Sequence, residues 1–218
     1  MNDLPADGVD DDGPPGSPAE SLRLIADQEA VARRELNVDP LVFNLPWGLA
    51  WLLGFGLLYL RFGPRDRVIV EMPAWLPLTV MFVAMGVAGV ITTVVPARVG
   101  RHMSGPTATQ GAMYGWAWFA TFAAIGGTAG IFGRQLPADQ ERLLWSWLCV
   151  LATGVLFICG AAVLRQVPMF VFGLSLIALD VVGVLAGPGW HSLIMAIGGG
   201  GGMIAFGVLG SWRHRRRR

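Results

Sequence analysis

The sequence predicts an all-α integral membrane protein with six transmembrane helices. Of its 218 residues, 54% are hydrophobic and only 14% are charged, and the mean hydropathy is +0.55. The apolar residues are gathered into six stretches of about 20 residues each. A helix of that length crosses the roughly 30 Å hydrocarbon core of a bilayer, because each residue rises about 1.5 Å and every backbone N–H is bonded within the helix.

The six predicted spans contain no arginine and a single carboxylate. They are residues 41–60, 74–95, 112–132, 144–164, 167–186 and 189–210. Pro64 and Pro73 lie in the loop between the first two spans, and Pro96 marks the end of the second, since proline breaks or ends helices. We therefore expect residues 41–212 to form one six-helix transmembrane domain.

Two further segments are predicted before the first span. Residues 1–16 carry five Asp and no basic residue among glycines and prolines, so they cannot bury apolar surface and are expected to form a disordered acidic tail. Ser17, Pro18 and Glu20 match the N-cap, the first-turn proline and the capping-box partner of a helix. We therefore expect a cytoplasmic helix over 17–40 that lies on the inner leaflet or packs on a partner protein.

The arginines predict the orientation of the spans. With six spans, both tails and the second and fourth loops share one side of the membrane, and that side carries eleven of the sixteen arginines. These are Arg23, Arg33, Arg34, Arg98, Arg101, Arg165, Arg213 and Arg215 to Arg218, and the other side has Arg61, Arg65, Arg67, Arg134 and Arg142. The positive-inside bias then places both termini in the cytoplasm, at the plasma membrane. The first outer loop, with three arginines, runs against this bias.

The basic tail over 213–218 has the simplest interpretation as a topology anchor. Its five arginines follow the last span directly, and each gains about 1 kcal/mol from an anionic leaflet. Nothing beyond charge points to nucleic acid, so we expect the lipid bilayer and no nucleic acid as the partner of this tail.

Asp180 is the acidic residue within the spans and the first candidate functional residue. It lies about thirteen residues past the inner end of the fifth span, in the outer half of the bilayer, where a charge is costly. It either forms a hydrogen bond to another helix as a neutral group or takes up and releases protons along a pathway. Polar residues at similar depth are its potential partners. They are Thr79, Thr128, Ser146 and, several ångströms nearer the outer surface, His191.

A glycine run in the middle of the sixth span supplies the other candidates, Gly198, Gly200 and Gly202. Small residues four apart let helices approach closely in lipid, whereas a run of them can also mark a flexible or broken helix of the kind that lines transporter sites. The same four-residue spacing recurs elsewhere, at Gly111 and Gly115, Gly126 and Gly130, and Gly183 and Gly187. With Asp180 and His191, the central run completes the predicted intramembrane site.

Enzyme signatures are missing from the sequence. It contains no HExxH, no GxSxG, no P-loop and no Cys/His cluster with metal-ligand spacing. Cys149 and Cys159 lie ten residues apart on one predicted helix, a separation of about 15 Å that is too long for a disulfide. We therefore expect no enzymatic activity, no catalytic or metal-binding residue and no cofactor.

Three segments resemble a family of small actinobacterial multi-pass membrane proteins. They are Asn44-Leu-Pro-Trp-Gly-Leu-Ala-Trp-Leu-Leu-Gly-Phe-Gly, Met113-Tyr-Gly-Trp-Ala-Trp-Phe and Leu185-Ala-Gly-Pro-Gly-Trp-His-Ser-Leu. The resemblance covers nearly all of residues 20–212. Members are usually labelled transporter or ABC transporter permease, so the resemblance implies a permease-like transport component. The layout is also similar to the membrane subunit of ABC-2 exporters, whose ATPase is a separate chain.

Six short helices enclose little room for a pathway, so we expect either a separate ATPase subunit or self-association. The alternative function is a non-transporting membrane sensor, scaffold or partner of a regulator. Such a protein would act through its cytoplasmic helix and its arginine tail.

Overall fold

The computed structural model describes residues 17–19, 21–24, 39–99 and 106–216. The chain divides into two units, residues 1–38 and residues 39–218. The described residues contain helices and loops and no strand, and six of the helices are long and apolar enough to cross a membrane. The predicted all-α class and the number of spans are therefore confirmed.

Only a short helical segment is described in the first unit. Residues 18, 19 and 21–24 are helical, and the backbone N–H of Ser21 donates to the carbonyl oxygen of Ser17 at 3.0 Å. This is the bond of a first helical turn, at the residue where the sequence predicts the helix to begin. The remainder of the predicted 17–40 helix up to residue 38, and the acidic tail, lie outside the described residues.

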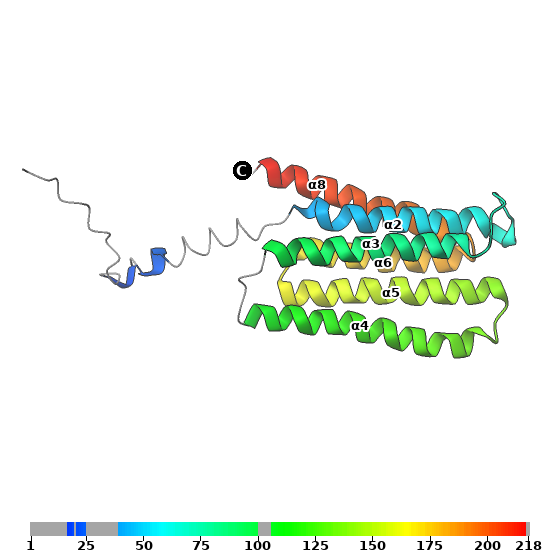
Figure 1. The fold of residues 1–218 in the computed structure, drawn as a ribbon, viewed down its shortest axis with the longest axis horizontal. Coiled ribbons are helices and arrows are strands. Elements are labelled where there is room, and N and C mark those ends of the chain that lie inside the picture. The colour runs from blue at the N-terminus through cyan, green and yellow to red at the C-terminus, as the bar shows by residue number, and fades with distance from the viewer. Residues whose placement is uncertain (1–16, 20, 25–38, 100–105, 217–218) are drawn as a thin grey trace, which may run out of the picture. The chain divides into compact units, whose positions relative to one another are not determined.

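Six long spans lie side by side in the second unit (Figure 1). The first five are α2 (Pro40–Arg61), α3 (Leu76–Val99), α4 (Pro106–Gly133), α5 (Ala138–Leu164) and α6 (Val167–Ala186). The sixth span has three consecutive parts, α7 (Trp190–Ile194), η2 (Met195–Gly201) and α8 (Gly202–Arg216). Because polar first turns precede their apolar parts, α4 and α5 begin earlier than hydropathy alone predicts.

The predicted end of the second span at Pro96 is wrong. Helix α3 continues through Pro96 to Val99, and α2 likewise contains Pro46. A proline removes one backbone hydrogen bond, a loss that membrane-spanning helices tolerate where neighbouring groups re-satisfy the freed backbone carbonyl.

Asp39 fixes the start of α2 against the end of the sixth span. One carboxylate oxygen accepts the backbone N–H of Leu41 at 2.9 Å, which caps the helix, and the other accepts the hydroxyl of Ser211 at 2.8 Å. The first and last spans of the bundle are therefore tied together at this end.

The sixth span joins the two halves of the bundle. Helix α2 packs on α3, η2 and α8, while α5 packs on α4 and α6, and both α7 and η2 contact α2 and α6. The apolar core contains buried side chains from α2, α5, α6 and the sixth span. They are Trp51, Phe55, Val150, Leu176, Met195, Ala196 and Met203.

We call the end of the bundle with the α2–α3 loop, the α4–α5 loop and the α6–α7 turn the loop end. The turn is so short that α6 and α7 form an antiparallel hairpin, and Gly189 within it has φ +85°. A Cβ atom at Gly189 would lie 2.5 Å from the backbone of Gly63 and Pro64. The turn and the α2–α3 loop therefore touch through their main chains, which only glycine permits.

Candidate functional site

The structure brings two of the predicted site residues together. The imidazole Nε2 of His191 and the carboxylate Oδ1 of Asp180 lie 2.7 Å apart, within hydrogen-bond distance. The two side chains are 1% and 0% exposed. We refer to them as the Asp180–His191 pair.

Two of the other potential partners of Asp180, Thr79 and Thr128, form hydrogen bonds elsewhere. The hydroxyl of Thr79 donates to the carbonyl of Trp75 at 3.0 Å, and that of Thr128 donates to the carbonyl of Ala124 at 2.7 Å. Each threonine thus satisfies its hydroxyl within its own helix. The structure places His191, which the sequence assigned to a shallower level, at the carboxylate instead.

Gly183 explains how His191 reaches so deep. It lies three residues after Asp180 on α6, hence on the same face of the helix. A Cβ atom at Gly183 would lie 2.8 Å from Cδ2 of His191 and 3.2 Å from its Cα. The imidazole therefore lies across the space that a side chain would fill, and the ring of Phe55 approaches it edge-on at 6.4 Å between centroids.

Two polar atoms of the pair are buried without a partner. Among the described residues, neither Oδ2 of Asp180 nor Nδ1 of His191 has a hydrogen bond, and neither has surface that a water molecule could touch. Unsatisfied buried polar atoms are rare in native proteins and are a reason to look for function. In this conformation, no ligand larger than a proton fits against these atoms.

The glycine run lies next to the pair as a π-helix, Met195–Gly201. A Cβ atom at Gly200 would lie 2.5 Å from the backbone nitrogen of Leu52, and one at Gly198 would lie 2.9 Å from the side chain of Leu179. A Cβ atom at Gly202 would meet nothing within 4 Å. Gly198 and Gly200 therefore permit close helix contacts, while Gly202 contributes none. The segment remains helical, but with the wider turn that often marks functional sites.

The two predicted glycine pairs of α4 have no such close contacts within the chain. Among the described residues, a Cβ atom at Gly111, Gly115 or Gly126 would meet nothing within 4 Å, and one at Gly130 would only reach Trp145 at 3.6 Å. These glycines of α4 do not bring helices of one chain into close contact.

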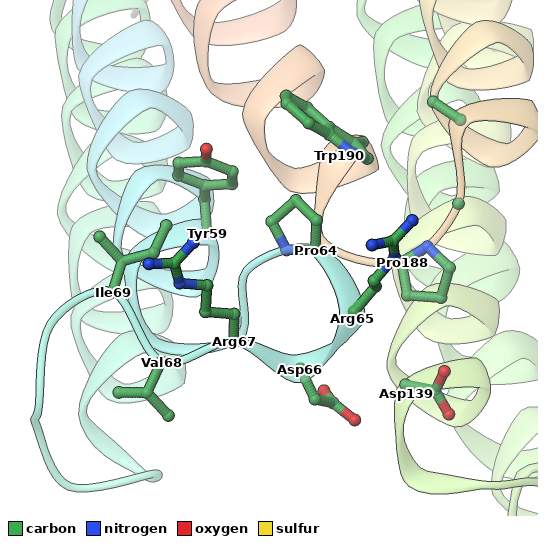
Figure 2. A pocket seen from close by; sticks show the side chains of 12 residues that line it. Tyr59, Pro64, Arg65, Asp66, Arg67, Val68, Ile69, Asp139, Pro188 and Trp190 are labelled. Atoms are coloured by element: carbon green, nitrogen blue, oxygen red, sulfur yellow. The ribbon is translucent and has the colours of Figure 1, made fainter.

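A depression with a volume of about 980 Å³ opens at the loop end. It is lined by Tyr59, Pro64, Arg65, Asp66, Arg67, Val68, Ile69, Asp139, Ala186, Gly187, Pro188 and Trp190 (Figure 2). We call it the loop-end depression. Trp190 precedes His191 in the chain, so the depression lies next to one member of the buried pair in the sequence. The sequence indicates no role for Arg65 and Arg67 beyond orientation, and their place in the lining of this depression is found in the structure.

The described part of the chain contains no group of three or more His, Cys, Asp or Glu side chains that could hold a metal ion. Comparisons with protein-family models, with curated proteins and with solved structures gave no match for this chain. The chemistry of the site is therefore inferred from its own geometry.

Proposed function

We propose that this protein is a permease-like transport component of the plasma membrane in which the Asp180–His191 pair binds and releases a proton. The observation that carries the proposal is the 2.7 Å contact between two fully buried ionisable groups, each with a further unpartnered polar atom. Intramembrane ionisable residues are uncommon because they are costly, and they mark ion and proton pathways in pumps and transporters.

The pair can exist in two protonation states that both keep its hydrogen bond. With Nδ1 of His191 protonated, imidazolium and carboxylate together carry no net charge. Without that proton, Nε2 still donates to Asp180, and the pair carries one negative charge. The apolar interior disfavours the net charge. Because Nδ1 is buried in this conformation, exchange of its proton requires water to reach it.

The π-turn provides an element that can open the site. A π-turn holds one extra residue. When the turn moves along the helix, each residue that it passes rotates by about 100° about the helix axis. Here it begins at Met195, four residues after His191, and the glycines that follow impose little side-chain restriction. Displacement of the turn toward Trp190 rotates His191 away from Asp180 while the span remains helical.

The proposed orientation places both termini in the cytoplasm and the loop end outside. The arginine distribution supports it, and the structure places the start of α2 and the end of α8 at the same end of the bundle (Figure 1). We retain a separate ATPase subunit or self-association as the partner. Helices α3 and α4 leave many apolar side chains exposed, including Phe82, Val83, Trp116 and Phe119, and either lipid or such a partner can cover them.

Proton flux through reconstituted protein tests the proposal. The purified chain is inserted into phosphatidylcholine–phosphatidylglycerol liposomes that contain pyranine, and a pH step is applied while potassium and valinomycin hold the membrane potential at zero. The wild type should dissipate the gradient faster than protein-free liposomes. His191→Gln keeps a donor for Asp180 but has no nitrogen that takes up a proton, so its flux should fall to the protein-free rate.

Two further variants separate a proton pathway from a structural bond. Asp180→Asn keeps an acceptor for Nε2 and should also lose the flux. Ser175→Ala removes an exposed hydroxyl of α6 that donates only to the carbonyl of Val171, and it should leave the flux unchanged. A wild-type rate equal to that of protein-free liposomes, or a His191→Gln variant as active as the wild type, would overturn proton transfer and favour the non-transporting sensor or scaffold.

A further inference from the structure

Four arginines lie around the α2–α3 loop, and the side chains of two of them have no hydrogen-bond or ion-pair partner among the described residues. The Nε of Arg61 donates to the carbonyl of Met72 at 2.8 Å, and Arg142 pairs with the carboxylate of Asp66. Within the described residues, the side chains of Arg65 and Arg67 form no hydrogen bond and no ion pair. Both line the loop-end depression. Their charge is therefore available to a ligand.

The loop that carries these arginines is held in place by its own backbone. The N–H of Gly63 donates to the carbonyl of Arg67 at 3.1 Å, and the N–H groups of Ile69 and Val70 donate to the carbonyl of Leu60 at 2.9 and 3.0 Å. Arg65 itself has φ +59°, a conformation that side-chain-bearing residues rarely adopt. Such strain persists where the surroundings impose it, and it gathers at binding sites.

Asp66 does not neutralise these two arginines. Its carboxylate is engaged by Arg142, whose guanidinium also lies over the ring of Phe62 at 4.4 Å. Figure 2 shows the side chains of Arg65 and Arg67 on either side of Pro64, with Asp66 pointing to the opposite side of the loop. The remaining acid of the lining is Asp139, in the first turn of α5. The two guanidinium groups therefore line one depression without an ion pair of their own.

The wall of the depression next to these charges is aromatic. The rings of Tyr59 and Trp190 lie 6.3 Å apart between centroids, and Trp190 is half-exposed. Aromatic residues with a polar edge prefer the headgroup region of a bilayer. A ligand in the depression would contact the two guanidinium groups with one of its parts and the apolar ring surface with another.

We propose that the loop-end depression binds a phosphate-bearing ligand between Arg65 and Arg67. Guanidinium groups match phosphate oxygens in geometry and charge, and a pair of them can hold one phosphate from two sides. The phosphate can belong to a lipid headgroup, whose glycerol part contacts Tyr59 and Trp190, or to a free phosphate ester from the aqueous phase. This site is independent of proton transfer at the buried pair, because it requires no movement of the helices.

Native mass spectrometry of the full chain tests the lipid source. The protein, delipidated in dodecyl maltoside, is titrated with phosphatidylglycerol and, in parallel, with an uncharged galactosyl diacylglycerol. The wild type should bind phosphatidylglycerol about tenfold or more tightly than the uncharged lipid, because each charge-assisted hydrogen bond lost costs about that factor. The double variant Arg65→Gln/Arg67→Gln should lose this preference.

Calorimetry with glycerol 3-phosphate and with inorganic phosphate, on the same delipidated protein, tests the free source. A heat of binding that disappears in the double variant would identify the ligand as a soluble phosphate ester. Binding of phosphatidylglycerol alone would identify it as a lipid headgroup. In the arm that binds, Asp139→Asn should raise the affinity, because it removes a negative charge from the lining.

Arg134→Gln is the matched control. Arg134 is an exposed arginine at the same end of the bundle but outside the depression. An equal loss of binding in this variant would show general surface charge and overturn the site. So would failure of the wild type to bind either ligand, or unchanged binding by a double variant with wild-type circular dichroism and elution volume.

Discussion

His191 reaches Asp180 across Gly183. The absence of a side chain at Gly183 leaves the room in which the imidazole contacts the buried carboxylate. The 2.7 Å contact between Nε2 and Oδ1 exists because the imidazole occupies the volume that a larger residue 183 would fill. The pair packs against the apolar core near Phe55, and neither member contacts solvent. The removal of either side chain leaves the other buried and unpaired.

We expect Asp180→Ala to lower the free energy of unfolding by about 1–3 kcal/mol, since it leaves a buried imidazole nitrogen without an acceptor. Asp180→Asn should lower it less, because the amide oxygen can still accept from Nε2. Tryptophan fluorescence during thermal unfolding in detergent measures both. If Asp180→Asn were no more stable than Asp180→Ala, the hydrogen bond that the amide oxygen retains would contribute nothing to folding.

Gly183→Ala should separate the pair without altering either member. The added methyl group would lie 2.8 Å from Cδ2 of His191, so the ring must move, at a cost of about 1–3 kcal/mol in unfolding free energy. The same variant should reduce the proton flux in liposomes. Gly202→Ala serves as the control, because its Cβ atom meets nothing within 4 Å. A Gly183→Ala protein with wild-type stability and flux would contradict the role given to this glycine.

Neighbouring glycines of the π-helix should respond in opposite ways to alanine. A Cβ atom at Gly200 would lie 2.5 Å from the nitrogen of Leu52 and 2.8 Å from the oxygen of Gly48, both main-chain atoms that cannot turn aside. We expect Gly200→Ala to destabilise the α2–η2 contact by about 1–3 kcal/mol. Gly201→Ala meets nothing within 4 Å and should be neutral or slightly stabilising. Thermal unfolding of the two variants side by side checks this; similar midpoints would refute it.

The membrane architecture could be predicted from the sequence because lipid imposes one strong rule, an apolar helix long enough to cross it. That rule places α2 and α6 to within one residue. It does not place the end of α3 or the starts of α4 and α5, where Pro96 and polar turns remain helical. The existence of a buried acid at Asp180 is likewise visible in the sequence.

The sequence does not identify the partner of Asp180, because the number of residues from the end of a helix gives only the depth of the backbone in the bilayer. Such a count ignores the reach of an imidazole across a glycine, and it places His191 nearer the outer surface than Thr79 and Thr128. The loop-end depression could not be predicted from the sequence either, because its lining residues come from segments that are distant in the chain. Arg65 and Arg67 did give one signal: they stand on the side where the positive-inside bias disfavours arginine.

The orientation can be checked by cysteine labelling in intact cells, in a background with Cys149 and Cys159 replaced by alanine. Val68→Cys introduces a thiol in the exposed α2–α3 loop, and Arg213→Cys introduces one near the exposed end of α8. Because the arginine excess places the end of α8 in the cytoplasm, a membrane-impermeant maleimide should label position 68 in intact cells and position 213 only after permeabilisation. The reverse pattern would invert the membrane topology and place the loop-end depression in the cytoplasm, where its phosphate ligand would be sought among cytoplasmic esters and inner-leaflet lipids.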